Sequence, residues 1–142
     1  MLSPLASPAI AVLRRASLIA MANNLDRLAG EDYCYLTTTG RVSGEPREIE
    51  IWFGLVGSTL YMLSGGRDRS DWVKNLMREP RVRVRIAGRT LGGQARVVDD
   101  PNEDARARTL LFAKYSPRYG GDLENWRESS LPIAVDLLTR SH

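Results

Sequence analysis

Apolar and polar residues alternate along several short stretches of the chain, as they do in strands that bury one face. Ile49, Ile51 and Phe53, for example, alternate with Glu48, Glu50 and Trp52. Such alternation, together with β-branched and aromatic residues, predicts six strands, over residues 33–39, 46–57, 59–63, 81–86, 90–98 and 131–138. Tight turns at Gly57-Ser58 and Gly88 separate neighbouring strands, so most of them are expected to pair antiparallel as hairpins.

Apolar residues at helical spacing predict two helices in the first half of the chain. Residues 21–30 form a short helix that ends at a Gly30 C-cap. The next helix follows Ser70 as its N-cap, has Asp71 in its first turn and ends before Pro80. The apolar face predicted for it consists of Trp72, Val73, Leu76 and Met77.

A third helix is predicted over residues 101–115. Asp100, Pro101 and Glu103 occupy the N-cap, N1 and N3 positions in the order that begins helices. Residues 116–130 are expected to be a polar connection to the last strand. Hairpins interrupted by helices indicate the α+β class: a small six-stranded barrel, mostly antiparallel, with inserted and flanking helices.

The chain has 142 residues, enough for one domain with its own core. Residues 1–20 differ from the rest, since they hold two prolines, Arg14 and Arg15, and no acidic residue. We expect a disordered leader or an upstream start there, and a single domain over residues 21–142. A membrane-touching amphipathic segment is the alternative, because no stretch has the length of a membrane span.

Charge and residue counts narrow the function classes. A net charge of only +3 argues against nucleic-acid binding driven by counterion release, so no nucleic-acid partner is expected. The single cysteine excludes an intramolecular disulfide and agrees with a reducing cytoplasm. One cysteine and one histidine are too few for a metal site built from these ligands, so no metal is expected.

Two loops rich in Gly, Ser and Arg are the main candidates for chemistry. Residues 40–47 read Gly-Arg-Val-Ser-Gly-Glu-Pro-Arg between two strands, and residues 64–67 read Ser-Gly-Gly-Arg before a helix. Backbone N–H groups next to glycine, and arginine guanidinium groups, bind phosphate. Taken alone, the first loop is as compatible with an ordinary hairpin loop as with a ligand-binding loop. If both loops meet at one end of the barrel, they form a concave, positive site for a phosphate-bearing ligand.

Several other residues admit both a structural and a functional interpretation. One strand face carries three arginines, Arg81, Arg83 and Arg85. An edge strand kept soluble by charge is favoured over a basic wall that meets an anionic ligand tail. Cys34 is expected to be a small core residue, because no histidine is available to activate it. Tyr115 and Tyr119 are candidates to close a pocket or donate a proton.

An ordered series of short motifs runs along the chain: Leu36-Thr37-Thr38-Thr39-Gly40-Arg41, Ser43-Gly44, Pro46-Arg47, Ser64-Gly65-Gly66, Trp72-x-x-Asn75-Leu76 and Pro80-Arg81-Val82. Over residues 33–138, this series resembles the deazaflavin-dependent nitroreductase and quinone reductase family. The resemblance implies a split β-barrel related to FMN-binding oxidoreductases, with the deazaflavin coenzyme F420 as cofactor. Val42 departs from the family pattern, which commonly has a lysine there, so one phosphate contact is missing.

The resemblance also implies a role for each matched residue. Those implied to hold the cofactor phosphate are Arg41, Ser43 and Arg47, with Gly65, Gly66 and Arg67 closing on it. Trp72 and Asn75 would shape the pocket from the helix. Ser64 matches a serine near the ring and the substrate, and Tyr115 and Tyr119 fall where family members place substrate-side tyrosines. These last three are the candidate catalytic residues.

The first hypothesis is therefore a reductase that transfers a hydride from the reduced deazaflavin to a quinone, a nitroaromatic or a similar conjugated acceptor. Ser64 or a tyrosine would stabilise the charge that develops. Two alternatives stay open: an FMN-binding split-barrel oxidoreductase, and a non-catalytic carrier of a cofactor or tetrapyrrole. The expected partner is a small-molecule electron acceptor in the cytoplasm, with a homodimer and peripheral membrane contact left open.

Overall fold

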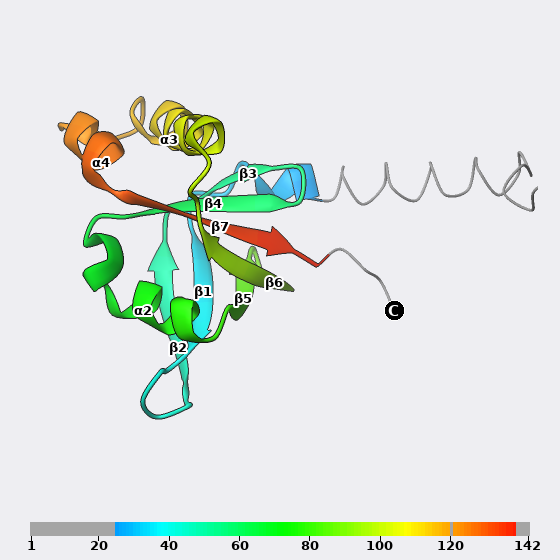
Figure 1. Ribbon diagram of the computed structural model, residues 1–142. Helices are drawn as coiled ribbons and strands as arrows, with labels where there is room; N and C mark the ends of the chain where they lie inside the picture. The colour runs from blue at the N-terminus through cyan, green and yellow to red at the C-terminus, as the bar shows by residue number, and fades with distance from the viewer. Residues whose placement is uncertain (1–24, 120, 139–142) are drawn as a thin grey trace, which may run out of the picture.

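The computed structural model describes residues 25–119 and 121–138. Its centre is a seven-stranded sheet in the order β2-β1-β5-β6-β7-β4-β3, curled into a half-barrel (Figure 1). The strands are β1 (Cys34–Thr39), β2 (Pro46–Ile51), β3 (Gly54–Val56), β4 (Thr59–Ser64), β5 (Arg81–Ile86), β6 (Arg89–Val97) and β7 (Leu131–Leu137). Neighbouring strands pair antiparallel throughout. The α+β split-barrel prediction is confirmed.

Helices cover the sheet at two places. They are α2 (Asp71–Arg78), α3 (Pro101–Tyr115) and α4 (Leu123–Ser129), with a 3₁₀ turn, η2 (Arg67–Arg69), ahead of α2. Figure 1 shows α3 and α4 together on the side of β3 and β4, while α2 lies beside β1. Residues 25–28 are also helical and bury Leu25 and Leu28, which agrees with the end of the helix predicted over 21–30.

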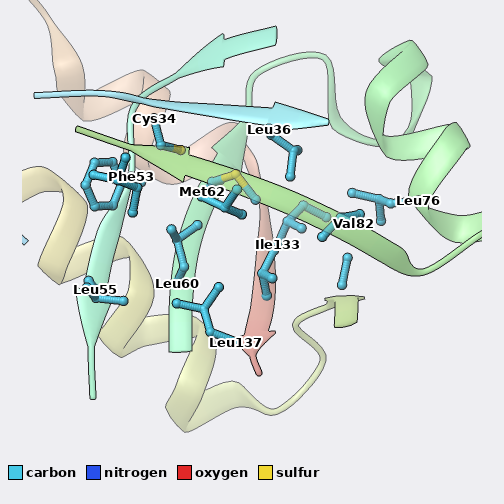
Figure 2. Close-up of a cluster of buried hydrophobic side chains, with 14 of the residues drawn as sticks. Cys34, Leu36, Phe53, Leu55, Leu60, Met62, Leu76, Val82, Ile133 and Leu137 are labelled. Carbon is cyan, nitrogen blue, oxygen red and sulfur yellow. The ribbon is translucent and has the colours of Figure 1, made fainter. Parts of the chain in front are cut away.

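Alternate side chains of the strands fill the inside of the half-barrel. Cys34 and Leu36 of β1 and Met62 of β4 are fully buried there (Figure 2). Burial raises the pKa of the Cys34 thiol to about 12, so the thiolate required of a nucleophile is disfavoured. The prediction that Cys34 is a small core residue is confirmed.

The strand predicted over residues 46–57 is wrong as a single element, and the count is seven strands rather than six. Trp52 and Phe53 leave the ladder, so that β2 pairs with β1 and β3 pairs with β4. In the gap, the Phe53 N–H donates to Tyr115 Oη at 3.0 Å, and Lys114 Nζ donates to the Phe53 C=O at 2.9 Å. Side chains of α3 therefore satisfy the backbone where no neighbouring strand does.

The predicted start of α3 is confirmed by its cap. Asp100 Oδ2 accepts a hydrogen bond from the Glu103 N–H at 2.8 Å, and Pro101 occupies the first turn. The Glu103 carboxylate is bound by Arg96 at 2.7 Å and by the Tyr61 hydroxyl at 2.6 Å. These partners lower the pKa of Glu103 to about 2 and anchor this end of α3 to the sheet.

Two helical expectations are wrong. Met77 is 58% exposed rather than part of the buried face of α2, which consists of Val73, Asn75 and Leu76. The segment expected to be a polar connection contains α4, which begins at an Asp122 cap whose side chain accepts from the Glu124 N–H at 3.0 Å. A helix this short carries too few apolar residues to show a period.

The arginine-bearing strand β5 is not an edge strand, because it lies between β1 and β6. Its arginines point to the outer face of the half-barrel, where Arg85 pairs with Glu48 at 3.3 Å and Arg81 with Glu79 at 2.9 Å. The expectations for residues 1–20 lie outside the described residues. Within the described ranges, no helix is both long and apolar enough to cross a membrane.

Candidate functional site

A groove of about 680 Å³ lies between the first Gly/Ser/Arg loop, β2 and α2. Of the residues predicted to bind the cofactor, it is lined by Arg41, Ser43, Arg47, Trp72 and Asn75. The loop and the helix are distant in sequence, and β1 brings them together at one end of the half-barrel. The structure therefore unites five of the nine predicted cofactor residues at one surface.

Asn75 of α2 binds Arg41 and so holds the first Gly/Ser/Arg loop against this helix. Its side chain is 4% exposed, and its Oδ1 accepts from the Arg41 backbone N–H at 3.1 Å and from Arg41 Nη1 at 2.9 Å. Its Nδ2 donates to Thr38 Oγ1 at 3.2 Å. Arg41 is fixed further by Asp71, 3.1 Å away. Asn75 thus positions Arg41 and has little capacity left for a ligand.

Arg47 is the group most open to a ligand in this groove. It donates a single hydrogen bond within the described structure, from Nη2 to Ser43 Oγ at 3.3 Å. A guanidinium group has five N–H donors, so most of the Arg47 fork is unused. Ser43 Oγ also accepts from the Glu45 N–H at 3.1 Å, so the Ser43 hydroxyl is held beside the Arg47 guanidinium. This pairing of donors suits an anionic, phosphate-like group.

The second loop closes on itself instead of opening onto the groove. Ser64 is 2% exposed, and its Oγ donates to the Arg67 C=O at 2.8 Å and lies 3.0 Å from Ser70 Oγ. A Cβ on Gly66 would stand 2.5 Å from Ser70 Oγ, so any larger residue there would displace the Ser70 hydroxyl. Gly65 is exposed at its outer corner. Ser70 occupies the predicted N-cap position, but its hydroxyl binds Ser64 rather than α2.

Arg67 also turns away from the groove. Its Nη1 donates to the Ser129 C=O at 2.8 Å, at the C-terminal end of α4. A cation at that end of a helix satisfies an orphan carbonyl and the helix dipole. The four predicted residues from Ser64 to Arg67 therefore shape the wall between α2 and α4, and do not line the groove with Arg47.

A second cavity of about 270 Å³ lies at the other end of β2, lined by Glu50, Ile51, Trp52, Leu63 and Trp126. Trp52 comes from the gap after β2, and Trp126 comes from α4. Their rings meet edge to face with centroids 5.5 Å apart. Neither tryptophan is among the site residues predicted from the sequence. A signal for Trp52 was available, since three consecutive apolar residues, Ile51-Trp52-Phe53, interrupt the alternation of the strand.

The two predicted substrate-side tyrosines lie beside this cavity in different environments. Tyr115 is fully buried and stacks on Trp52 with ring centroids 4.3 Å apart; its hydroxyl donates to the Asp32 C=O at 2.6 Å. Burial raises the pKa of Tyr115 to about 12. Tyr119 is 38% exposed, with its ring centroid 4.6 Å from that of Trp52. Of the two, only Tyr119 has a hydroxyl with no hydrogen-bond partner among the described residues.

Solved structures similar to this fold belong to proteins with different described functions. An F420 reductase is 18% identical over 80% of this chain and 92% of that chain, with a TM-score of 0.58. A proposed 5-nitroimidazole antibiotic resistance protein from Bacteroides thetaiotaomicron is 16% identical over 81% and 78% of the two chains, with a TM-score of 0.62. A haem-binding protein from Mycobacterium smegmatis is 16% identical over 84% and 51%, with a TM-score of 0.65. At these identities the likeness establishes the fold alone.

The family is decided by a match of the sequence itself. Residues 13–138 match the F420H(2)-dependent quinone reductase family, which is most of the chain. This match confirms the resemblance inferred from the motifs and, with it, an F420-dependent oxidoreductase. The chain belongs to the F420H(2)-dependent quinone reductase family.

Proposed function

We propose that the groove along β2 holds F420 with its phosphate at Arg47, and that the aromatic cavity receives the quinone or nitroaromatic acceptor. One observation carries this proposal. Every residue from Pro46 to Trp52 lines one of the two cavities: residues 46–49 line the groove, and residues 50–52 line the aromatic cavity. Among the described strands, β2 pairs only with β1, so no described strand covers its other edge between the two cavities.

The residues at the Arg47 end fit a phosphate-bearing cofactor. Among the described residues, the Arg47 side chain donates only to Ser43 Oγ, and Arg41 adds a second positive charge held in place by α2. Charge-assisted hydrogen bonds of this kind are about twice as strong as neutral ones. Trp72 covers the groove from α2 and offers an apolar surface. We assign cofactor binding to Arg41, Ser43, Arg47 and Trp72, with Asn75 as their support.

At the other end, the chain orients an acceptor and excludes water. When bound, reduced F420 supplies the hydride. Trp52 and Trp126 present aromatic faces at nearly right angles, and Ile51 and Leu63 add apolar surface beside the Glu50 carboxylate. A flat conjugated molecule matches such a cavity better than a polar one does. Orientation and desolvation are then the contribution of the protein, as expected for a site without a protein nucleophile.

Tyr119 is the proposed proton donor to the reduced acceptor. Its ring contacts Trp52, and its partial exposure lets the hydroxyl regain a proton from solvent. The hydroxyl of Tyr115 and that of Ser64 are engaged inside the protein, so we assign these two residues to shaping the site.

Fluorescence titration of the full chain with F420 and with FMN in parallel tests the cofactor assignment. Preferential binding of F420, followed by turnover of a soluble quinone with the reduced form, is the expected result. Preference for FMN would support the flavin-dependent alternative. If neither cofactor binds, the groove does not hold an isoalloxazine-like ligand, and the carrier alternative with a tetrapyrrole is tested next.

The sequence leaves open a homodimer and peripheral membrane contact, and both stay predictions. Light scattering during gel filtration measures the mass of the full chain in solution. Co-sedimentation with anionic and neutral vesicles measures membrane contact. A monomer that remains in the supernatant with both kinds of vesicle would contradict both expectations.

A further inference from the structure

We propose that the last turn of α3 positions Trp52 and thereby decides which acceptors the aromatic cavity accepts. Lys114 and Tyr115 are the positioning residues, and neither lines the cavity itself. The inference rests on the assignment of the acceptor to this cavity, and extends it to the residues that determine specificity.

The backbone of the gap between β2 and β3 depends on α3. Phe53 pairs with none of the described strands, and its N–H and C=O instead bind Tyr115 Oη at 3.0 Å and Lys114 Nζ at 2.9 Å. Two consecutive side chains of one helix turn thus replace both ladder hydrogen bonds at this point. Because Trp52 directly precedes Phe53, these bonds fix the direction in which the Trp52 side chain leaves the backbone.

Tyr115 constrains Trp52 a second time through its ring. The two rings are parallel within 4°, with centroids 4.3 Å apart. The Tyr115 hydroxyl, which accepts from Phe53, also donates to the Asp32 C=O at 2.6 Å and so ties the gap to the start of β1. With a buried ring and a hydroxyl bound on both sides, Tyr115 gives the indole a rigid backing surface.

Lys114 gives up hydration to reach this place. Its Nζ lies 3.8 Å from the centroid of the buried Phe53 ring, and its side chain is half-buried. Burial lowers the pKa of Lys114 to about 8, as expected for an amine moved out of water. A lysine with no structural task would keep its amine in solvent. The hydrogen bond to Phe53 and the cation–π contact offset the lost hydration, so the side chain is held at the gap.

The experiment compares variants of the full chain with reduced F420 as donor and two soluble quinones, one with a single ring and one with two fused rings. Tyr115→Phe keeps the stacking ring and removes the hydroxyl bonds. Lys114→Met keeps an unbranched apolar stem and removes the ammonium, and Lys114→Arg restores a donor. Glu103→Gln is the matched control, because it weakens the opposite end of α3 without touching Phe53.

We expect Tyr115→Phe and Lys114→Met to lower kcat/KM for the two-ring quinone by roughly 10-fold or more, since a small misplacement of an orienting group has effects of this order. The fall in kcat/KM should be smaller for the one-ring quinone, because a single ring contacts less of the Trp52 indole. The Kd of F420 should not change, and Lys114→Arg should recover most of the loss. Glu103→Gln should leave the ratio of the two quinones unaltered even where it lowers the melting temperature.

An unaltered quinone ratio in both α3 variants overturns the positioning role, and so does an equal change in Glu103→Gln. Trp52→Ala separates this failure from a failure of the proposed function. If Trp52→Ala also leaves the ratio unaltered, the acceptor binds elsewhere and the proposed site is wrong. If Trp52→Ala changes the ratio and the α3 variants do not, only the positioning role is wrong.

Discussion

The two Gly/Ser/Arg loops look alike in sequence and differ in what their polar atoms do after folding. In the first loop, the Arg47 side chain makes one hydrogen bond among the described residues, to Ser43 Oγ, and it lines the groove. In the second, the Ser64 hydroxyl is bound to Arg67 O and Ser70 Oγ inside the loop. Of the two, only the first has side-chain donors that are mostly unused among the described residues, so loops of similar composition can differ in what they offer a ligand.

Glycine has the same use in both loops. A Cβ on Gly40 would stand 2.9 Å from Ser43 Oγ, and one on Gly66 would stand 2.5 Å from Ser70 Oγ. In each case, glycine makes room for an atom of the loop itself rather than for a ligand. Glycine in such a loop therefore indicates a tight turn, and an arginine such as Arg47, with one side-chain hydrogen bond among the described residues, is the better sign of a ligand site.

The largest expected effect separates the two loop arginines. Arg47→Ala should weaken F420 binding by about 10- to 100-fold, because hydrogen bonds to charged groups contribute about 1.5–3 kcal/mol each. Arg67→Ala should change the same Kd by no more than about 2-fold, since Arg67 holds α4 through a surface contact of small net worth. Fluorescence titration measures both. Equal losses in the two variants would mean that both loops meet the phosphate, as the sequence predicts.

The next effect concerns the support beneath the first loop. Asn75→Ala should lower the free energy of unfolding by about 1–3 kcal/mol, since it leaves the Arg41 N–H and Thr38 without their partner. It should also weaken F420 binding, because Arg41 loses its anchor. Urea unfolding and titration measure the two quantities. Asn75→Asp, which keeps the acceptor for Arg41, should retain more of the binding than the alanine variant.

A smaller effect tests the hydroxyl inside the second loop. Ser64→Ala should lower the free energy of unfolding by about 1 kcal/mol, the usual net worth of a hydrogen bond, and leave kcat and the F420 Kd near their original values. Thermal unfolding and steady-state kinetics provide the comparison. A large fall in kcat with unaltered stability would instead support the catalytic role that the family resemblance implies for Ser64.

The smallest expected effect adds a charge to the first loop. Val42 is 93% exposed and lines the groove, at the place where the family commonly has a lysine. Val42→Lys should tighten F420 binding by about 1.4- to 5-fold, in line with the roughly 0.2–1 kcal/mol of exposed ion pairs, and raised salt should remove the gain. Val42→Gln controls for side-chain length. Tightening by the glutamine variant as well would point to packing rather than charge.

Local signals account for the parts of the fold that were predictable. Asp100, Pro101 and Glu103 predicted the start of α3 because a helix cap is made by residues within one turn. The gap after β2 was not predictable in this way, because the hydroxyl that satisfies Phe53 comes from Tyr115, 62 residues later. The short helix α4 was not predicted for a different reason: its seven residues are too few to show an apolar period.

By itself, the sequence determined the family and the F420 cofactor, because these follow from short motifs. It also predicted the loop with Arg41, Ser43 and Arg47 that we propose as the phosphate site, and these residues line one groove in the structure. Only the tertiary structure decided that Arg67 binds α4, that the Ser64 hydroxyl is used inside its loop, and that Trp52 and Trp126 share one cavity. The physical reason is that a residue type sets which bonds a side chain can make. Whether those bonds are left for a ligand depends on partners that folding brings from distant parts of the chain.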